Sequence, residues 1–205
     1  MLLYAITDRR LLPGNEAQRG AALVELARGW AQGGVDYIQI REKDLQGPAL
    51  LGLTQGIVVA VREEGSESRV LVNGPVEIAM QAGADGVHLP GSAPAGAADQ
   101  ARLVFQGVGR EPIVSWASHS VEEMRAANRA SLVVFAPVFE KVSGQDVQEG
   151  VGLATLAEAC RAAGPVSVIA LGGVTADNAA KCIAAGAAGV AGIRLFLGDE
   201  WQRLR

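Results

Sequence analysis

The sequence predicts an α/β protein, a (β/α)8 TIM barrel forming a single domain over residues 1–205. Short apolar segments alternate with segments of helical period along the whole chain, which calls for a parallel sheet with right-handed crossovers. Similar Gly-containing phrases end helices and begin strands at residues 32–36, 82–87 and 185–190. The alternative is a doubly wound open sheet, but the first strand is followed by Thr7-Asp8-Arg9-Arg10 instead of a G-x-G-x-x-G phrase. The barrel is therefore favoured.

The strands are predicted by apolar runs bounded by polar or glycine residues. In chain order the eight runs are Leu2–Thr7, Tyr37–Glu42, Val70–Asn73, Gly86–Leu89, Ile113–Ala117, Leu132–Phe139, Val166–Leu171 and Val190–Leu195.

The helices are predicted by apolar residues that recur at helical spacing between these runs. In the first helix Leu23, Leu26 and Trp30 fall on one stripe. The segment 93–105 is a weaker helix because Gly96 lies inside it. The predicted helices are Ala17–Gln32, Pro48–Glu63, Val76–Ala82, Ala93–Phe105, Val121–Ala130, Gly152–Ala163 and Ala176–Ala185.

Composition excludes several classes of protein. The net charge is −4 with no long run of like charge, which argues against a nucleic-acid partner. No apolar run reaches membrane-spanning length, and the N-terminus has no signal-peptide pattern, so no membrane partner is expected. Cys160 and Cys182 lack metal-like spacing and are predicted to be buried free thiols, which suits the cytoplasm. The sequence leaves a homo-oligomer open.

The most informative phrase is the polar end of the second predicted strand, where Gln39, Arg41 and Lys43 are spaced two apart. Side chains alternate on a strand, so these three are expected to point the same way. Buried cations require an anionic partner. Carboxylates of neighbouring strands are one alternative, and an anionic substrate, a phosphate or carboxylate, is the favoured one because few acidic residues stand at other strand ends.

Polar residues collect at the carboxyl ends of the predicted strands, which is the end of a TIM barrel that carries the active site. Both histidines of the protein, His88 and His119, fall there. The candidate substrate-binding residues at these ends are Gln39, Asn73, His88, Ser118 and Lys141.

A phosphate site is expected after the last two predicted strands. Gly172-Gly173 precede a helix and would expose backbone N–H groups to a ligand. Gly192, Ile193 and Arg194 lie at the end of the predicted eighth strand, and phosphate sites between the seventh and eighth strands are frequent in this fold. The alternative is that the two glycines only form a tight turn.

Short phrases along nearly the whole chain resemble the thiamine-phosphate synthase and thiazole tautomerase superfamily. In order and spacing they are Tyr4-Ala5-Ile6-Thr7-Asp8, Gln39-Ile40-Arg41-Glu42-Lys43, Val72-Asn73, Ala84-Asp85-Gly86-Val87-His88-Leu89, Ser118-His119-Ser120, Pro137-Val138-Phe139, Gly152-Leu153, Ala170-Leu171-Gly172-Gly173 and Gly189-Val190-Ala191. The resemblance implies an enzyme of thiamine biosynthesis acting on small phosphorylated pyrimidine and thiazole substrates.

For a synthase, the resemblance implies coupling of hydroxymethylpyrimidine diphosphate with a thiazole phosphate and release of pyrophosphate, with Mg²⁺ as cofactor. Gln39, Arg41 and Lys43 match the residues that hold the diphosphate, and Asn73 matches a residue on the pyrimidine side. Gly172-Gly173 and the backbone after the eighth strand match the thiazole phosphate cradle.

The sequence departs from the synthase pattern at the metal ligands. Asn73-Gly74 replaces Asn-Asp, and residues 90–94 replace a Gly-Gln-x-Asp phrase, so no metal-ligating residue is assigned; Asp8 or Asp44 could substitute. Lys141 stands earlier than the lysine of the usual Thr-x-Thr-Lys phrase, and Arg194 replaces a small residue.

These departures favour the tautomerase branch or a divergent synthase. A tautomerase needs an acid/base rather than a metal, and His119 matches the family histidine that suits this role. The candidate catalytic residues are thus His119, Arg41 and Lys43. A non-catalytic barrel that binds thiamine-pathway phosphates, or another phosphate-binding barrel enzyme, remains the alternative from a different class.

Overall fold

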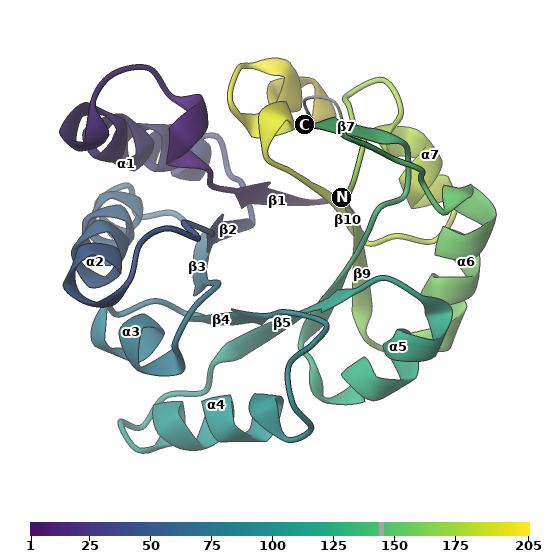
Figure 1. The fold of residues 1–205 in the computed structure, drawn as a ribbon, viewed down its shortest axis with the longest axis horizontal. Helices are drawn as coiled ribbons and strands as arrows, with labels where there is room; N and C mark the ends of the chain where they lie inside the picture. The colour runs from purple at the N-terminus through teal and green to yellow at the C-terminus, as the bar shows by residue number, and fades with distance from the viewer. Residues whose placement is uncertain (144–145) are drawn as a thin grey trace.

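The structure, a computed structural model, describes residues 1–143 and 146–205, without the side chains of residues 125, 126, 128, 141–143 and 146. Eight parallel strands close into a barrel in the order β1-β10-β9-β6-β5-β4-β3-β2. The helices form an outer ring around it (Figure 1). The predicted (β/α)8 barrel is confirmed.

The barrel strands are short and buried. They are β1 Leu2–Ile6, β2 Tyr37–Ile40, β3 Arg69–Val72, β4 Gly86–Leu89, β5 Ile113–Ser118, β6 Leu132–Phe135, β9 Ser167–Ala170 and β10 Gly189–Gly192. A separate antiparallel pair, β7 Lys141–Ser143 and β8 Asp146–Gln148, lies in the connection between β6 and α6.

The helices follow the strands with defined starts. Asn15 forms a capping box with Gln18 at the start of α1, and Ser120 accepts the Glu123 N–H at the start of α5. The α-helices are α1 Glu16–Gln32, α2 Gly47–Glu63, α3 Val76–Gln81, α4 Ala97–Gln106, α5 Val121–Ala126, α6 Gly152–Ala162 and α7 Ala179–Ala184. Short 3-10 turns are η1 Arg9–Leu11, η2 Ala127–Arg129, η3 Arg194–Phe196 and η4 Glu200–Leu204.

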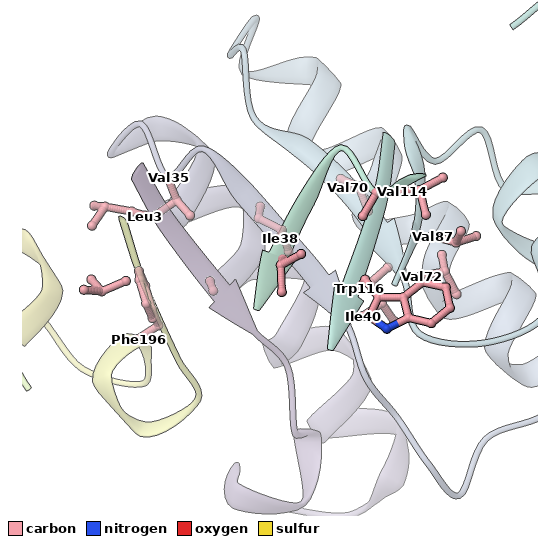
Figure 2. Close-up of a cluster of buried hydrophobic side chains, with 14 of the residues drawn as sticks. Leu3, Val35, Ile38, Ile40, Val70, Val72, Val87, Val114, Trp116 and Phe196 are labelled. Atoms are coloured by element: carbon pink, nitrogen blue, oxygen red, sulfur yellow. The ribbon is translucent and has the colours of Figure 1, made fainter. Parts of the chain in front are cut away.

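Two apolar clusters result from the alternation of side chains along the strands. One face of each strand packs against the helices, where Leu3, Ile38, Val70 and Val114 lie in the large cluster shown in Figure 2. The other face fills the barrel interior, whose buried members are Tyr4, Ile6, Leu71, Leu132, Val134, Ile169 and Ala191. The register extends the interior face to Gln39, which pairs with Ile6 and Leu71 of this cluster.

Several predicted boundaries were wrong. The second strand ends at Ile40, the sixth at Phe135 and the eighth at Gly192. Pro137 follows the sixth strand closely and has no N–H to donate to a sheet ladder. The helix expected from residue 93 begins at Ala97, because Gly96 before it has a φ of +87°.

Cys160 and Cys182 are both free thiols. Cys182 is buried as predicted, and burial raises its pKa to about 11. Cys160 is only half-buried. Among the described residues, no helix is both long enough and apolar enough to cross a membrane.

Candidate active site

Gln39 and Arg41 both lie at the carboxyl end of β2. Gln39 pairs in register with Ile6 and Leu71, two residues of the barrel interior, and is 1% exposed. Its Nε2 atom has no hydrogen-bond partner, although a buried donor normally has one. The backbone N–H of Arg41, just beyond the strand, donates to Thr7 Oγ1 over 2.9 Å. The barrel mouth, at the carboxyl ends of the strands, therefore has a buried amide at Gln39 and a cationic residue two positions later at Arg41.

Arg41 is half-buried, and among the described residues no carboxylate lies within ion-pair distance of its guanidinium. The hydrogen bond to Arg10 is the main cause that lowers the pKa of Asp8, and burial is the main cause for His88; the charge of Arg41 adds to both shifts, so Arg41 lies within electrostatic reach of both groups. The expected placement of Lys43 beside it on one strand was wrong. Because β2 ends at Ile40, Lys43 belongs to the following turn and is exposed.

An ion-pair network does form here, but around Arg9 instead of Arg41. The buried Arg9 guanidinium lies 2.9 Å from Glu42, 2.7 Å from Asp44 and 2.8 Å from Glu16. Its hydrogen bonds lower the pKa of Asp44 to about 2. Sequence reasoning missed Arg9 and Glu42 as partners, although an arginine after one strand and an acid after the next was a usable signal.

His88 faces the barrel interior near the end of β4. Its Nδ1 atom lies 2.9 Å from Ser115 Oγ, which in turn accepts a hydrogen bond from the Tyr4 hydroxyl over 3.2 Å. Burial, and secondarily the charge of Arg41, lowers the pKa of His88 to about 3, so the ring is neutral at physiological pH. Sequence reasoning missed Tyr4, although a tyrosine between inward-facing Leu2 and Ile6 requires a polar partner.

Ser118 ends β5 and His119 follows it, and the two residues lie in different environments. His119 is exposed, and its Nδ1 atom lies 2.8 Å from the carbonyl oxygen of Ala136, the residue that follows β6. Glu123 accepts its backbone N–H over 2.6 Å. Ser118 is buried, and its hydroxyl donates to the Ser120 carbonyl over 3.1 Å, within its own turn. His119 thus stands at the rim, whereas the Ser118 hydroxyl is engaged locally.

The glycine pair after β9 packs against the loop after β6. A Cβ on Gly172 would lie 2.6 Å from Pro137 Cα, and one on Gly173 would overlap the Glu140 carbonyl oxygen. This close packing, together with φ values of +97° and +61°, requires glycine at both positions, and the phosphate-binding role of the pair stays a prediction. This turn and Arg41 lie at the same end of the barrel, with β1 and β10 between their strands.

The remaining candidates lie at the same end. Asn73 follows β3 and is half-buried, and its N–H donates to the Ile40 carbonyl over 2.9 Å. Gly192 ends β10 and is buried, Ile193 is half-buried, and Arg194 opens η3 with an exposed side chain. The side chain of Lys141 lies outside the part of the chain that the structure describes.

The carboxylates at the mouth do not fit the magnesium site that the resemblance implies. Glycine at position 74 and residues 90–94 supply no carboxylate. Asp8 and Asp44, the substitutes that the sequence offered, are held by Arg10 at 2.8 Å and by Arg9 at 2.7 Å. Among the described residues, no three His, Cys, Asp or Glu side chains group as metal ligands.

Known proteins match this chain along nearly its whole length. The family model described as thiamine monophosphate synthase matches residues 3–196. A thiamine-phosphate synthase of Methanoculleus marisnigri is 39% identical over 201 residues, covering 96% of this chain and 88% of that protein. One of Roseiflexus castenholzii is 32% identical over 200 residues, covering 96% and 81%.

A solved structure shares the fold at similar coverage. The thiamine phosphate pyrophosphorylase of Pyrococcus furiosus superposes with a TM-score of 0.76 at 25% identity, covering 98% of this chain and 90% of that one. The sequence phrases, the barrel and these matches agree: this chain belongs to the thiamine monophosphate synthase family and is an enzyme of thiamine biosynthesis.

Proposed function

We propose that this protein is a transferase that couples hydroxymethylpyrimidine diphosphate with a thiazole phosphate and releases pyrophosphate. The observation that carries the proposal is that half-buried Arg41 has no ion-pair carboxylate among the described residues and stands two positions beyond Gln39, whose buried Nε2 atom lacks a partner. A cation and a buried donor at one barrel mouth suit a ring that carries a diphosphate. The names of the full-length relatives support the same reaction.

In this reaction the bond between the pyrimidine methylene carbon and the diphosphate oxygen breaks, and the electron pair leaves with the diphosphate. The thiazole nitrogen then forms the new C–N bond. Arg41, with Lys43 in the neighbouring turn, would carry the charge that develops on the leaving group. Gln39, Asn73 and His88 would orient the pyrimidine beneath them.

The thiazole phosphate is proposed to bind on the far side of the mouth. The turn at Gly172-Gly173 and the backbone from Gly192 to Arg194 end neighbouring strands there. Phosphate groups bind at this place in many barrels of this fold. The free thiols support a cytoplasmic location for the enzyme.

Magnesium is the cofactor that the resemblance implies for a synthase. Because the mouth carboxylates are held by arginines, we assign the stabilisation of the leaving group to the cationic side chains of this chain. Whether the coupling reaction depends on a metal can be tested by measuring its rate with Mg²⁺ and with a chelator.

The tautomerase reaction is the second candidate, and the position of His119 favours it. Donation from Nδ1 to the Ala136 carbonyl would leave Nε2 unprotonated and able to accept a proton at the rim. In this reading Arg41 or Lys43 would hold the substrate carboxylate.

The deciding experiment assays purified wild type, Arg41→Ala and His119→Ala for both reactions. Under the transferase proposal wild type releases pyrophosphate from the two substrates, Arg41→Ala loses this activity, and His119→Ala retains it. Turnover of thiazole carboxylate phosphate that is lost in His119→Ala, without any coupling, would replace the proposal with the tautomerase. Binding of either substrate without turnover in either assay would contradict both reactions.

A further inference from the structure

A buried chain of hydrogen bonds runs across the barrel interior from β1 to β4. The Tyr4 hydroxyl lies 3.2 Å from Ser115 Oγ, and Ser115 Oγ lies 2.9 Å from His88 Nδ1. Tyr4 and Ser115 are both 0% exposed, so water cannot replace a missing partner. Each polar proton of these three groups must therefore find its acceptor among the three groups themselves.

Only one arrangement of protons satisfies all three groups. If Tyr4 donates to Ser115 and Ser115 donates to Nδ1, each hydroxyl proton has an acceptor. If His88 Nδ1 instead donated a proton to Ser115 Oγ, two cases would be possible. The Ser115 hydroxyl would either donate its own proton to the Tyr4 oxygen or leave that proton without an acceptor. In the first case the Tyr4 proton would have no acceptor among the described residues, and in the second the Ser115 proton would have none.

The opposite edge of the ring reaches the mouth. Among the described residues no group bonds His88 Nε2, and this atom is not one of the enclosed polar atoms that lack a partner. The charge of Arg41, which follows β2 at this end of the barrel, acts on this ring. A proton on Nε2 would therefore be offered to whatever occupies the mouth.

We propose that Tyr4 and Ser115 are positioning residues that hold His88 as the neutral Nε2–H tautomer, so that it donates a hydrogen bond to an acceptor atom of the ligand. The buried Nε2 atom of Gln39, which also lacks a partner, adds a second donor on the interior face of β2. A heteroaromatic ring with unprotonated ring nitrogens is the chemical class that suits two such donors. The identity of the ligand as a pyrimidine rests on the proposed function, whereas the tautomer does not.

The tautomer can be read directly, because the protein has only two histidines. Nitrogen NMR of ¹⁵N-histidine-labelled protein at pH 7 distinguishes protonated from unprotonated ring nitrogens, and His119→Ala assigns the two rings. We expect His88 to be protonated at Nε2 and unprotonated at Nδ1. Protonation at Nδ1 in the wild type would overturn the proposal.

Variants of the chain test the positioning role. Ser115→Ala should shift the His88 tautomer ratio toward Nδ1–H by about tenfold, equivalent to about 1.4 kcal/mol. Tyr4→Phe should shift it in the same direction by less, because the Ser115 hydroxyl remains. Tyr37→Phe is the matched control: its ring packs 5.6 Å from that of Tyr4, but its hydroxyl makes no hydrogen bond to a described residue.

An unchanged His88 tautomer ratio in Ser115→Ala would show that Ser115 has no positioning role. If Tyr4→Phe fails to fold, the result for Ser115→Ala alone decides between the two outcomes. A further NMR experiment adds thiamine phosphate as a ligand to the ¹⁵N-histidine-labelled wild-type protein. A shifted Nε2 resonance that keeps its proton supports donation to an acceptor, and loss of that proton on binding would refute it. Absence of binding would count against the proposed function, while the tautomer in the free protein would still decide the role of Tyr4 and Ser115.

Discussion

Arg9 and Glu42 form a buried ion pair that joins the loop after β1 to the loop after β2. Arg9 Nη1 lies 2.9 Å from Glu42 Oε2, and the two side chains are 4% and 1% exposed. The Glu42 carboxylate also accepts the backbone N–H of Arg9 at 3.2 Å. Because Glu42 stands between Arg41 and Lys43 in the chain, this pair fixes the loop that carries both candidate catalytic cations.

Removal of the Glu42 charge should destabilise the protein. Glu42→Gln leaves Arg9 buried with a weaker partner, and we expect the free energy of unfolding to fall by about 3 kcal/mol. Urea denaturation followed by circular dichroism measures the change. Glu16→Gln is the control, because Glu16 bonds the same arginine but is 64% exposed, and it should cost less than about 1 kcal/mol. Equal losses of unfolding free energy in the two variants would contradict a special structural role for the buried Arg9–Glu42 ion pair.

Arg41→Ala should lower kcat for pyrophosphate release by about 10²–10³, the usual loss when a group stabilising the transition state is removed. Lys43→Ala should lose less, because its exposed ammonium is surrounded by water. Steady-state kinetics measure both. Arg69→Ala, at the first residue of β3 and thus at the opposite end of the barrel, should keep wild-type kcat. Equal kinetics in all three variants would argue against a charge-stabilising role for Arg41.

The buried neutral His88 should make stability depend on pH. Its pKa is about 3 when folded and about 6.5 when unfolded, so below pH 6.5 the unfolded chain binds the proton and the folded one does not. The contribution is complete above about pH 6.5 and is lost as the pH falls toward about 3. Urea midpoints for wild type and His88→Gln should diverge between pH 7 and 4, with the flatter profile in the variant. Parallel profiles would show that His88 titrates normally.

A carboxylate at position 74 should create a dependence on magnesium. Gly74 has a negative φ, and a Cβ there would lie 3.2 Å from the Leu50 side chain, which can move slightly. We expect Gly74→Asp to increase the stimulation of coupling by Mg²⁺, because a carboxylate next to Asn73 supplies the ligand type that this ion prefers. Rates with Mg²⁺ and with chelator measure it, and Gly198→Asp, at an open position, is the control. Equal stimulation in both variants would exclude this position as a metal site.

Gly172→Ala should destabilise the protein by more than its backbone conformation alone requires. Gly172 has a φ of +97° and its added Cβ would meet the Pro137 backbone at 2.6 Å. Gly164 has a φ of +59° but faces open space, so Gly164→Ala measures the conformational cost alone, about 1 kcal/mol. Thermal unfolding of the two variants should separate the additional cost of the contact. Similar melting temperatures would mean that the loop after β6 moves away freely.

The fold could be predicted from the sequence because its signals are local. Apolar runs of strand length alternate with helical stripes, and each glycine phrase before a strand marks the same turn, so the barrel followed without any knowledge of distant contacts. The clustering of polar residues at the carboxyl strand ends likewise followed from the topology. Strand ends were less predictable, since only pairing with a neighbour decides where β2 stops before Arg41.

By itself the sequence determined the barrel, the family and the end of the molecule where chemistry occurs, since these depend on order and spacing along the chain. Tertiary structure decided which charges meet: Arg9, not Arg41, takes the neighbouring carboxylates, and Tyr4 reaches Ser115 across 111 positions of sequence. The physical reason is that ion pairs and buried hydrogen bonds depend on distances of a few ångströms between side chains. Such distances are set only when the strands close into a ring.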